Sequence, residues 1–117
     1  MKLDGNGRLL RVFIGEADML NHRPLYEAIV LKARELGLAG ATVLKGVQGY
    51  GADSRVIHTA KILRLSEDLP ILIKIVDTED KIRQALPELD DMMEASGGGG
   101  LITLEFAEII KYTQGRS

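Results

Sequence analysis

The chain has 117 residues, a net charge of −2 and no cysteine. This length fits one domain with a modest core. The lack of a basic excess argues against a nucleic-acid binder. The lack of cysteine excludes disulfides, thiolate catalysis and thiolate-bound zinc. No apolar run reaches the roughly 18 residues that cross a bilayer, and residues 1–11 lack the apolar centre of a signal peptide. We therefore expect a cytoplasmic protein.

The first third of the chain predicts a tail, a strand and a helix. Residues 1–7 contain two glycines, an aspartate and an asparagine, which is typical of a flexible tail. Leu9–Ile14 is a short apolar run with β-branched residues, and it predicts a buried strand. Asn21–Leu36 predicts a helix, because Pro24 suits a first turn and apolar residues recur along one stripe. Gly37 suits the position after the last turn.

The middle of the chain predicts two strands separated by a long loop. Gly40–Val47 has the alternation of a strand. Residues 46–59 (Gly46–Thr59) predict a long exposed loop, and loops of this size in compact domains tend to be functional. Ile57–Leu65 also alternates, so an extended hairpin is the alternative. Leu69–Asp77 is the stronger strand, because three isoleucines share one face.

The last third predicts a helix and a closing strand. Thr78–Ala95 has a capping threonine and an acidic first turn, both typical of a helix start. Pro87 lies inside this pattern and predicts a kink or a break into two short helices. Gly97–Gly100 follow as four consecutive glycines, and Leu101–Tyr112 predicts the final strand.

The order of these elements predicts the fold class. Strand, helix, strand, loop, strand, helix, strand is the arrangement of an α+β, ferredoxin-like βαββαβ sandwich with an antiparallel sheet. We expect residues 1–117 to form one such domain. Two helices cover one face of the sheet, so the apolar residues on the other face need a different cover. A closed ring such as a homotrimer would bury them.

The sequence offers little support for an enzyme or a metal site. Its two histidines, His22 and His58, stand in no recognised catalytic or zinc-binding motif. Acidic pairs such as Asp90–Asp91 are best explained as solvated helix residues. We therefore expect no catalytic residue and no metal cofactor.

Two glycine clusters are more informative about a ligand. Successive glycine N–H groups can converge on a phosphate, so Gly97–Gly100 is a candidate phosphate cradle. Gly46, Gly49 and Gly51 form the second cluster. The stretch Lys45–Arg64 holds four basic residues against one acid, which suits an anion such as a nucleotide. Flexible turns and a solvated loop explain the same residues equally well.

With these residues in view, the chain resembles the signal-transduction protein PII. It resembles more closely a PII-like family of short uncharacterised prokaryotic proteins. The likeness is carried by Leu10–Gly15 (LRVFIG), Pro24–Ala41 (PLYEAIVLKARELGLAGA) and Lys45–Pro70 (KGVQGYGADSRVIHTAKILRLSEDLP). It extends from about Arg8 to Tyr112, which is nearly the whole chain.

The resemblance implies a trimer that binds an adenine nucleotide (AMP, ADP or ATP) in clefts between subunits and acts in regulation. It also implies that the long loop contacts a partner protein, such as a membrane transporter or an enzyme. Gly97–Gly100 would then hold phosphates, and Lys111, with Arg116 as a second candidate, would be the basic position near the C-terminus. The candidate nucleotide-binding residues are Gly46, Gly49, Gly51, Arg55, His58, Gly97, Gly98, Gly99, Gly100 and Lys111.

The sequence also departs from PII in two places. PII has a lysine directly after its phosphate loop, whereas Leu101 follows Gly100 here. PII has a modifiable tyrosine deep in its long loop, whereas Tyr50 stands near the start of this one. Two alternatives therefore stay open. One is a structural or interaction trimer without a small ligand, and the other is a CutA-like metal-handling trimer.

Overall fold

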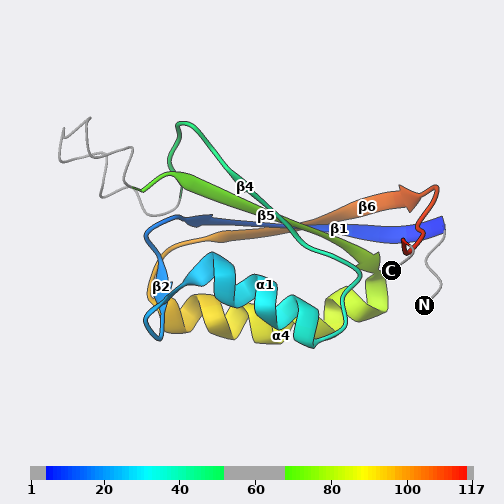
Figure 1. The fold of residues 1–117 in the computed structure, drawn as a ribbon, viewed down its shortest axis with the longest axis horizontal. Helices are drawn as coiled ribbons and strands as arrows, with labels where there is room; N and C mark the ends of the chain where they lie inside the picture. Colours follow the sequence, from blue (N-terminus) through cyan, green and yellow to red (C-terminus); the bar gives the residue numbers. More distant parts are fainter. Residues whose placement is uncertain (1–4, 52–67, 116–117) are drawn as a thin grey trace.

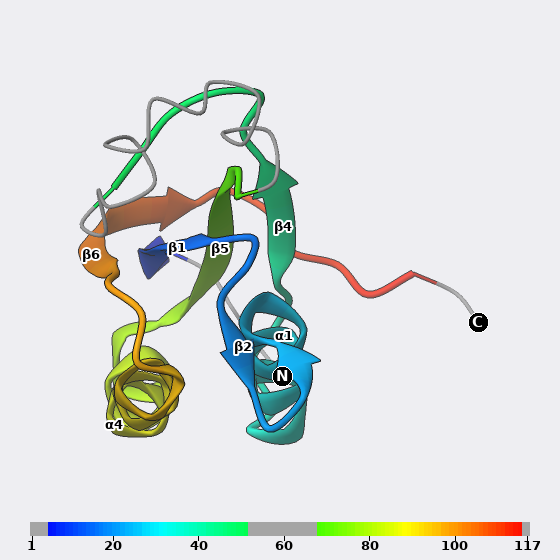
Figure 2. The same ribbon diagram turned by 90° about the vertical axis from the view of Figure 1, so that its left-hand side faces the viewer.

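The protein is built from a four-stranded antiparallel sheet with two helices on one face (Figures 1 and 2). The computed structural model describes residues 5–51 and 68–115. The sheet order is β4-β5-β1-β6, and every neighbouring pair is antiparallel. This is the α+β, ferredoxin-like topology that the sequence predicts. The main elements are β1 (Gly5–Gly15), α1 (Leu25–Glu35), β4 (Thr42–Lys45), β5 (Pro70–Thr78), α4 (Glu79–Ser96) and β6 (Leu101–Ile109).

The core lies between the sheet and the helices. Alternate residues of β1 and β5 point to the helices, and the register puts Leu10 opposite Ile75 and Val12 opposite Ile73. All four of these side chains are buried. The helices contribute one apolar stripe each to the same cluster: Leu25, Ile29 and Ala33 from α1, and Ile82, Ala85, Leu89 and Met93 from α4.

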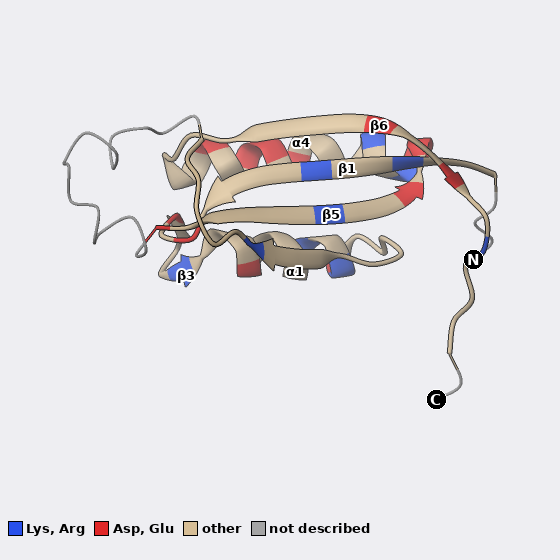
Figure 3. Ribbon diagram, turned by 90° about the horizontal axis from the view of Figure 1, so that it is seen from above, with Lys and Arg blue, Asp and Glu red and all other residues tan. Residues whose placement is uncertain are grey.

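The opposite face of the sheet, which we call the open face, is also apolar. Its cross-strand register forms a row of four residues, one from each strand: Leu44, Leu72, Phe13 and Leu101. Phe13, Leu44 and Leu101 are exposed. Neither helix lies over this face, and few of its strand positions carry charge (Figure 3). No helix in the described ranges is both long and apolar enough to cross a bilayer.

The first strand starts earlier than the sequence predicts. β1 begins at Gly5 instead of Leu9, so residues 5–7 belong to the sheet and not to a flexible tail. Gly7 pairs with Ala107 of β6, and a Cβ on Gly7 would lie 2.5 Å from Cδ1 of Ile109. The glycine is therefore explained by close approach inside a strand, which a local pattern of turn-forming residues does not reveal.

The first helix starts later than predicted, at Leu25 instead of Asn21. Asn21 and His22 form the tight turn of a small hairpin, between β2 (Met19–Leu20) and β3 (Arg23–Pro24). Their φ angles are +51° and +67°, as a two-residue turn of this hand requires. Pro24 caps the helix, and the N–H of Leu25 donates to the carbonyl of Asp18 at 2.8 Å.

The second helix runs without a break past Pro87, so the predicted division into two short helices is wrong. The buried stripe on both sides of the proline holds the helix against the sheet and offsets the lost backbone hydrogen bond. Its predicted start is confirmed, because the hydroxyl of Thr78 accepts from the N–H of Lys81. Gly97 ends it in the left-handed conformation. The predicted strand Ile57–Leu65 lies outside the described residues.

Among the described residues, Asp77 is the buried side chain with an ionisable group. Asp77, at the end of β5, has no exposed surface. One carboxylate oxygen accepts from the N–H of Ala39 at 2.9 Å, and the other accepts from the N–H of Thr78 at 2.6 Å. The carboxylate thus ties the segment that leads into β4 to the start of α4.

We predict that Asp77→Ala lowers the free energy of unfolding by about 2–4 kcal/mol, because it leaves the partly buried N–H groups of Ala39 and Thr78 without an acceptor. Asp77→Asn keeps one acceptor oxygen and should cost about half as much. Urea denaturation measures both effects. The control is Asp90→Asn, an exposed position on α4, which should change stability by less than about 0.5 kcal/mol. Equal stability of Asp77→Ala and the control would contradict the prediction.

Candidate functional site

The glycines that open the long loop lie against the start of β5. Gly46 donates its N–H to the carbonyl of Pro70 at 2.8 Å, and a Cβ at Gly46 would lie 2.8 Å from Cγ of Pro70. Gly49 has a φ of +145°, which side chains rarely adopt. Gly51 lies in open space. These glycines let the chain leave β4 close to its neighbour strand.

Gly97–Gly100 lie at the same end of the sheet, between α4 and β6. Two of the four N–H groups are used within the chain: that of Gly97 donates to the carbonyl of Glu94, and that of Gly98 donates to Oγ of Ser96. Gly99 is exposed. A Cβ at Gly100 would meet Cε of Met93 and would lie 3.1 Å from the carbonyl oxygen of Phe13, so the Met93 side chain would have to shift. Part of the glycine run is therefore explained by the turn itself.

The described side chains at this end of the sheet are mostly acidic. A Cβ at Gly98 would lie 2.6 Å from a carboxylate oxygen of Asp18. The carboxylate of Asp68 accepts from the N–H of Ala17 at 3.0 Å. Lys45 forms an ion pair with Glu16 at 2.9 Å. The sequence predicts an excess of basic residues in Lys45–Arg64. Of these basic residues the described ranges contain Lys45, and its charge is already paired with that of Glu16.

Two predicted site residues, Arg55 and His58, lie outside the described residues, as does Arg116. Lys111 is described, and it lies at the opposite end of β6 from Gly97–Gly100. The nine residues of β6 span about 30 Å at 3.3 Å per residue. A single chain therefore does not bring Lys111 and Gly97–Gly100 together.

Lys111 lines a cleft that we call the lysine cleft. It lies where the open face meets the segment before β4, and its volume is about 460 Å³. The charged side chains among its lining residues are Lys74 and Lys111, with no carboxylate beside them. The remaining lining residues are Leu9, Ala39, Gly40, Ala41, Thr42, Leu44, Val76, Ile109 and Tyr112. The cleft thus combines two cations with apolar walls and one aromatic ring.

Lys74 is not among the site residues that the sequence predicts. Residues 39–42, which form one wall of the lysine cleft, are not among them either. Lys74 does interrupt an apolar strand at an outward position, and this was the available signal. Its relevance depends on the register, which puts Thr42 opposite Lys74 on β4 and brings the wall beside it.

The wall of the lysine cleft is held from two sides. The carboxylate of Asp77 accepts from the N–H of Ala39, and the hydroxyl of Tyr112 donates to the carbonyl of Ala39 at 3.3 Å. Lys81, in the first turn of α4, donates to the carbonyl of Gly37 at 2.7 Å. The backbone of this segment is thus positioned before a ligand arrives.

Comparison with known proteins gives the family. The profile of DUF190, described as "Uncharacterized ACR, COG1993", matches residues 7–109. The chain belongs to this family. A UPF0166 protein of Aquifex aeolicus is 37% identical over 103 residues, which cover 88% of this chain and 92% of that protein. A UPF0166 protein of Methanocaldococcus jannaschii is 34% identical over 90 residues, which cover 77% and 82%.

PII-like proteins are among the solved structures that share this fold. CPII of Thiomonas intermedia K12, bound to ADP, AMP and acetate, aligns with a TM-score of 0.64 and 15% identity over 92% of this chain and 91% of CPII. A PII-like signalling protein of Thermus thermophilus aligns with a TM-score of 0.62 and 14% identity over 92% and 94%. The predicted resemblance to a PII-like family is confirmed, and the DUF190 protein has a PII-like fold.

The pair Glu16–Lys45 predicts a pH response at the start of the long loop. The hydrogen bond from Lys45 lowers the pKa of Glu16, and the same contact raises the pKa of Lys45. A carboxyl with a lowered pKa stabilises the fold above its ordinary pKa, and this contribution is lost as the pH falls through the lowered value. Carbon-detected NMR should therefore show Glu16 titrating below an ordinary glutamate.

Lys45→Met should return the titration of Glu16 to the ordinary range. The control is Lys32→Met, which removes a lysine paired with other glutamates, Glu35 and Glu88. The control should leave the Glu16 midpoint unchanged. An identical Glu16 midpoint in the native protein and in Lys45→Met would show that the pair does not form in solution.

Proposed function

We propose that this DUF190 protein is a PII-like regulatory protein and not an enzyme. Its ligand would be an adenine nucleotide, AMP, ADP or ATP, held between the subunits of a homotrimer. The PII-like protein CPII, which shares the fold, is known bound to ADP and AMP. In this chain the residues that line the lysine cleft include no histidine, carboxylate or thiol that could serve as a general base. The polar side chains that do line it, two lysines and a tyrosine among apolar walls, suit the binding of an anion with a flat apolar part.

The lysine cleft is the observation that carries the proposal. Its volume of about 460 Å³ lies within the usual range of small-molecule sites, which is roughly 300–1,000 Å³. Apolar side chains such as Val76 and Ile109, with the ring of Tyr112, suit a flat base. Lys74 and Lys111 suit phosphate, since an ammonium group acts as a point charge with three donors.

The glycine run supports a site shared between subunits. Gly97–Gly100 and Lys111 are at opposite ends of β6, so one ligand can contact both only if two chains supply them. The uncovered apolar row of the open face gives the chain a reason to associate. Three copies around a common axis would cover each other's open faces and bring the glycines of one subunit to the lysine cleft of the next.

The long loop would contact a partner protein, such as a membrane transporter or an enzyme. The described start of this loop presents two exposed apolar side chains: Val47 is 93% exposed and Tyr50 is 73% exposed. Exposed apolar groups beside a ligand site suit a contact that a nucleotide could regulate.

Calorimetric titration with AMP, ADP and ATP tests the nucleotide. We expect at least one to bind below about 1 mM, and Lys111→Ala to weaken it about tenfold, the usual effect of losing a charge-assisted hydrogen bond. Gly99→Val should weaken it at least as much, because a β-branched residue restricts the backbone that would donate to phosphate.

Lys32→Ala is the matched control, because it removes a lysine of α1 outside the cleft. If none of the three nucleotides binds the native protein below millimolar concentration, the nucleotide proposal fails, and a trimer that acts only through protein contacts takes its place. If only Lys111→Ala weakens binding, the ligand does not reach the glycine run.

Light scattering tests the trimer. We expect a mass three times the 12.8 kDa of the chain, and Phe13→Glu should dissociate the assembly, because it places a charge in the centre of the apolar row. Leu31→Glu is the control, since Leu31 is a similarly exposed hydrophobic residue on α1, away from the open face. A monomer mass for the native protein at micromolar concentration would refute the prediction.

A further inference from the structure

The sheet ends at a long unpaired edge. β6 pairs with β1 without interruption from Leu101 to Ile109, and no described strand pairs with its outer side. An edge strand leaves alternate N–H and C=O groups without ladder partners. β6 contains no proline, and its nine residues make it longer than the other edge strand, β4, which has four. Its backbone is therefore open to pairing with another extended chain.

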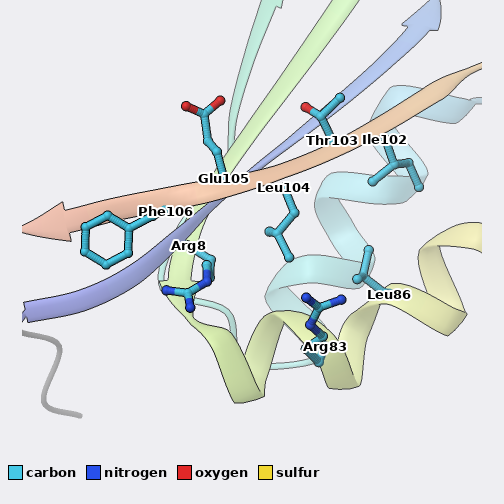
Figure 4. Close-up of a pocket in the computed structure, with 8 residues that line it drawn as sticks. All are labelled: Arg8, Arg83, Leu86, Ile102, Thr103, Leu104, Glu105 and Phe106. Atoms are coloured by element: carbon cyan, nitrogen blue, oxygen red, sulfur yellow. The ribbon is translucent and has the colours of Figure 1, made fainter.

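A groove of about 320 Å³ follows this edge, and we call it the β6 groove (Figure 4). Five consecutive residues, Ile102–Phe106, line it. Successive strand residues point to opposite faces, so five in a row can line a groove only if the backbone edge itself lines it. Leu86 and Arg83 of α4 and Arg8 of β1 complete the lining on the helix side of the sheet (Figure 4).

The charged side chains that line the β6 groove are those of Arg8, Arg83 and Glu105. The guanidinium of Arg8 lies 5.4 Å from the ring centre of Phe106 and pairs with Glu79 at 3.1 Å. Glu79 also holds Nε of Arg83 at 3.4 Å. Among the described residues, the terminal nitrogens of Arg83 have no other partner, so they can donate into the groove. The carboxylate that lines the groove, Glu105, is paired with Arg11.

We propose that the β6 groove binds an extended acidic segment of a partner protein, which adds to the sheet as a strand beside β6. The backbone edge supplies main-chain hydrogen bonds, and alternate side chains of the added strand enter the groove. One of them is acidic and contacts Arg83 and Arg8, since arginine binds carboxylates with two parallel hydrogen bonds. Its neighbours two residues away are apolar and cover Leu86 and Ile102.

The charge of the groove argues for a different protein as the partner over the free edge of a second copy. That edge, β4, consists of Thr42–Lys45 and carries a lysine and no carboxylate. It therefore offers the two arginines no carboxylate to pair with. The β6 groove is also separate from the lysine cleft, which shares none of its lining residues. Strand addition therefore does not depend on nucleotide binding.

The experiment is an NMR titration of the ¹⁵N-labelled native protein with a blocked seven-residue peptide, threonine–valine–threonine–glutamate–threonine–valine–threonine. We expect shifts concentrated on β6 amides and a dissociation constant below about 1 mM. Arg83→Gln should weaken binding about tenfold. Arg34→Gln, which removes another exposed arginine, on α1, should bind as the native protein does.

Two further peptides separate the parts of the proposal. Replacing the glutamate by glutamine should weaken binding about tenfold, as Arg83→Gln does. Methylating the backbone nitrogens of the glutamate and of the threonine before it removes a ladder donor from each edge of the added strand and should abolish binding. The proposal is overturned if β6 amides do not shift at about 5 mM peptide, or if either modified peptide binds as well as the first. It is also overturned if the β6 amides that do not pair with β1 already exchange slowly in the free protein because another copy covers them.

Discussion

The pairing of β1 with a strand on each side is the constraint on which the rest of the structure depends. β1 alternates strictly, so Leu10 and Val12 face the helices while Arg11 and Phe13 face away. A slip of one residue against either neighbour would exchange these two faces. The register therefore fixes at once the sealed core beneath the sheet and the open face above it. The lysine cleft and the β6 groove lie where they do because β1 places β5 and β6 at fixed register.

The second organising feature is the junction between β5 and α4. Asp77 ends the strand, and its two oxygens hold the backbone of Ala39 and of Thr78. A buried carboxylate is costly unless its hydrogen bonds are complete, and no buried side-chain polar atom of the described residues lacks a partner. The first turn of α4 then extends the junction, because Lys81 holds Gly37 and Glu79 holds Arg8. One short segment thus positions a wall of the lysine cleft and an arginine of the β6 groove.

Features that neighbouring residues determine can be predicted from the sequence, and features that depend on pairing cannot. The cap at Thr78 and the turn at Gly37 follow from local signals, and the structure confirms both. The hairpin turn at Asn21 falls inside a predicted helix, because its signal is two positive φ angles that no periodicity reports. Lys74 escapes prediction because only the register shows that it faces the same cleft as Lys111. The fold class is thus readable from the sequence, while the candidate site depends on contacts between distant segments.

The separation of charge along the sheet limits how the two ends can communicate. Carboxylates such as Asp18 and Asp68 lie at the end that carries the glycine loops, whereas Lys111 of the lysine cleft follows the other end of β6, about 30 Å along the strand from Gly97–Gly100. Exposed charges are largely screened beyond about 8–10 Å at physiological salt. An anion bound at Lys111 therefore does not act through the field on Gly97–Gly100 of its own chain. It can act on the long loop of its own chain through β4, because Leu44 lines the cleft and β4 leads into that loop, or on a neighbouring subunit whose glycines it touches. Only the second route makes assembly part of the response.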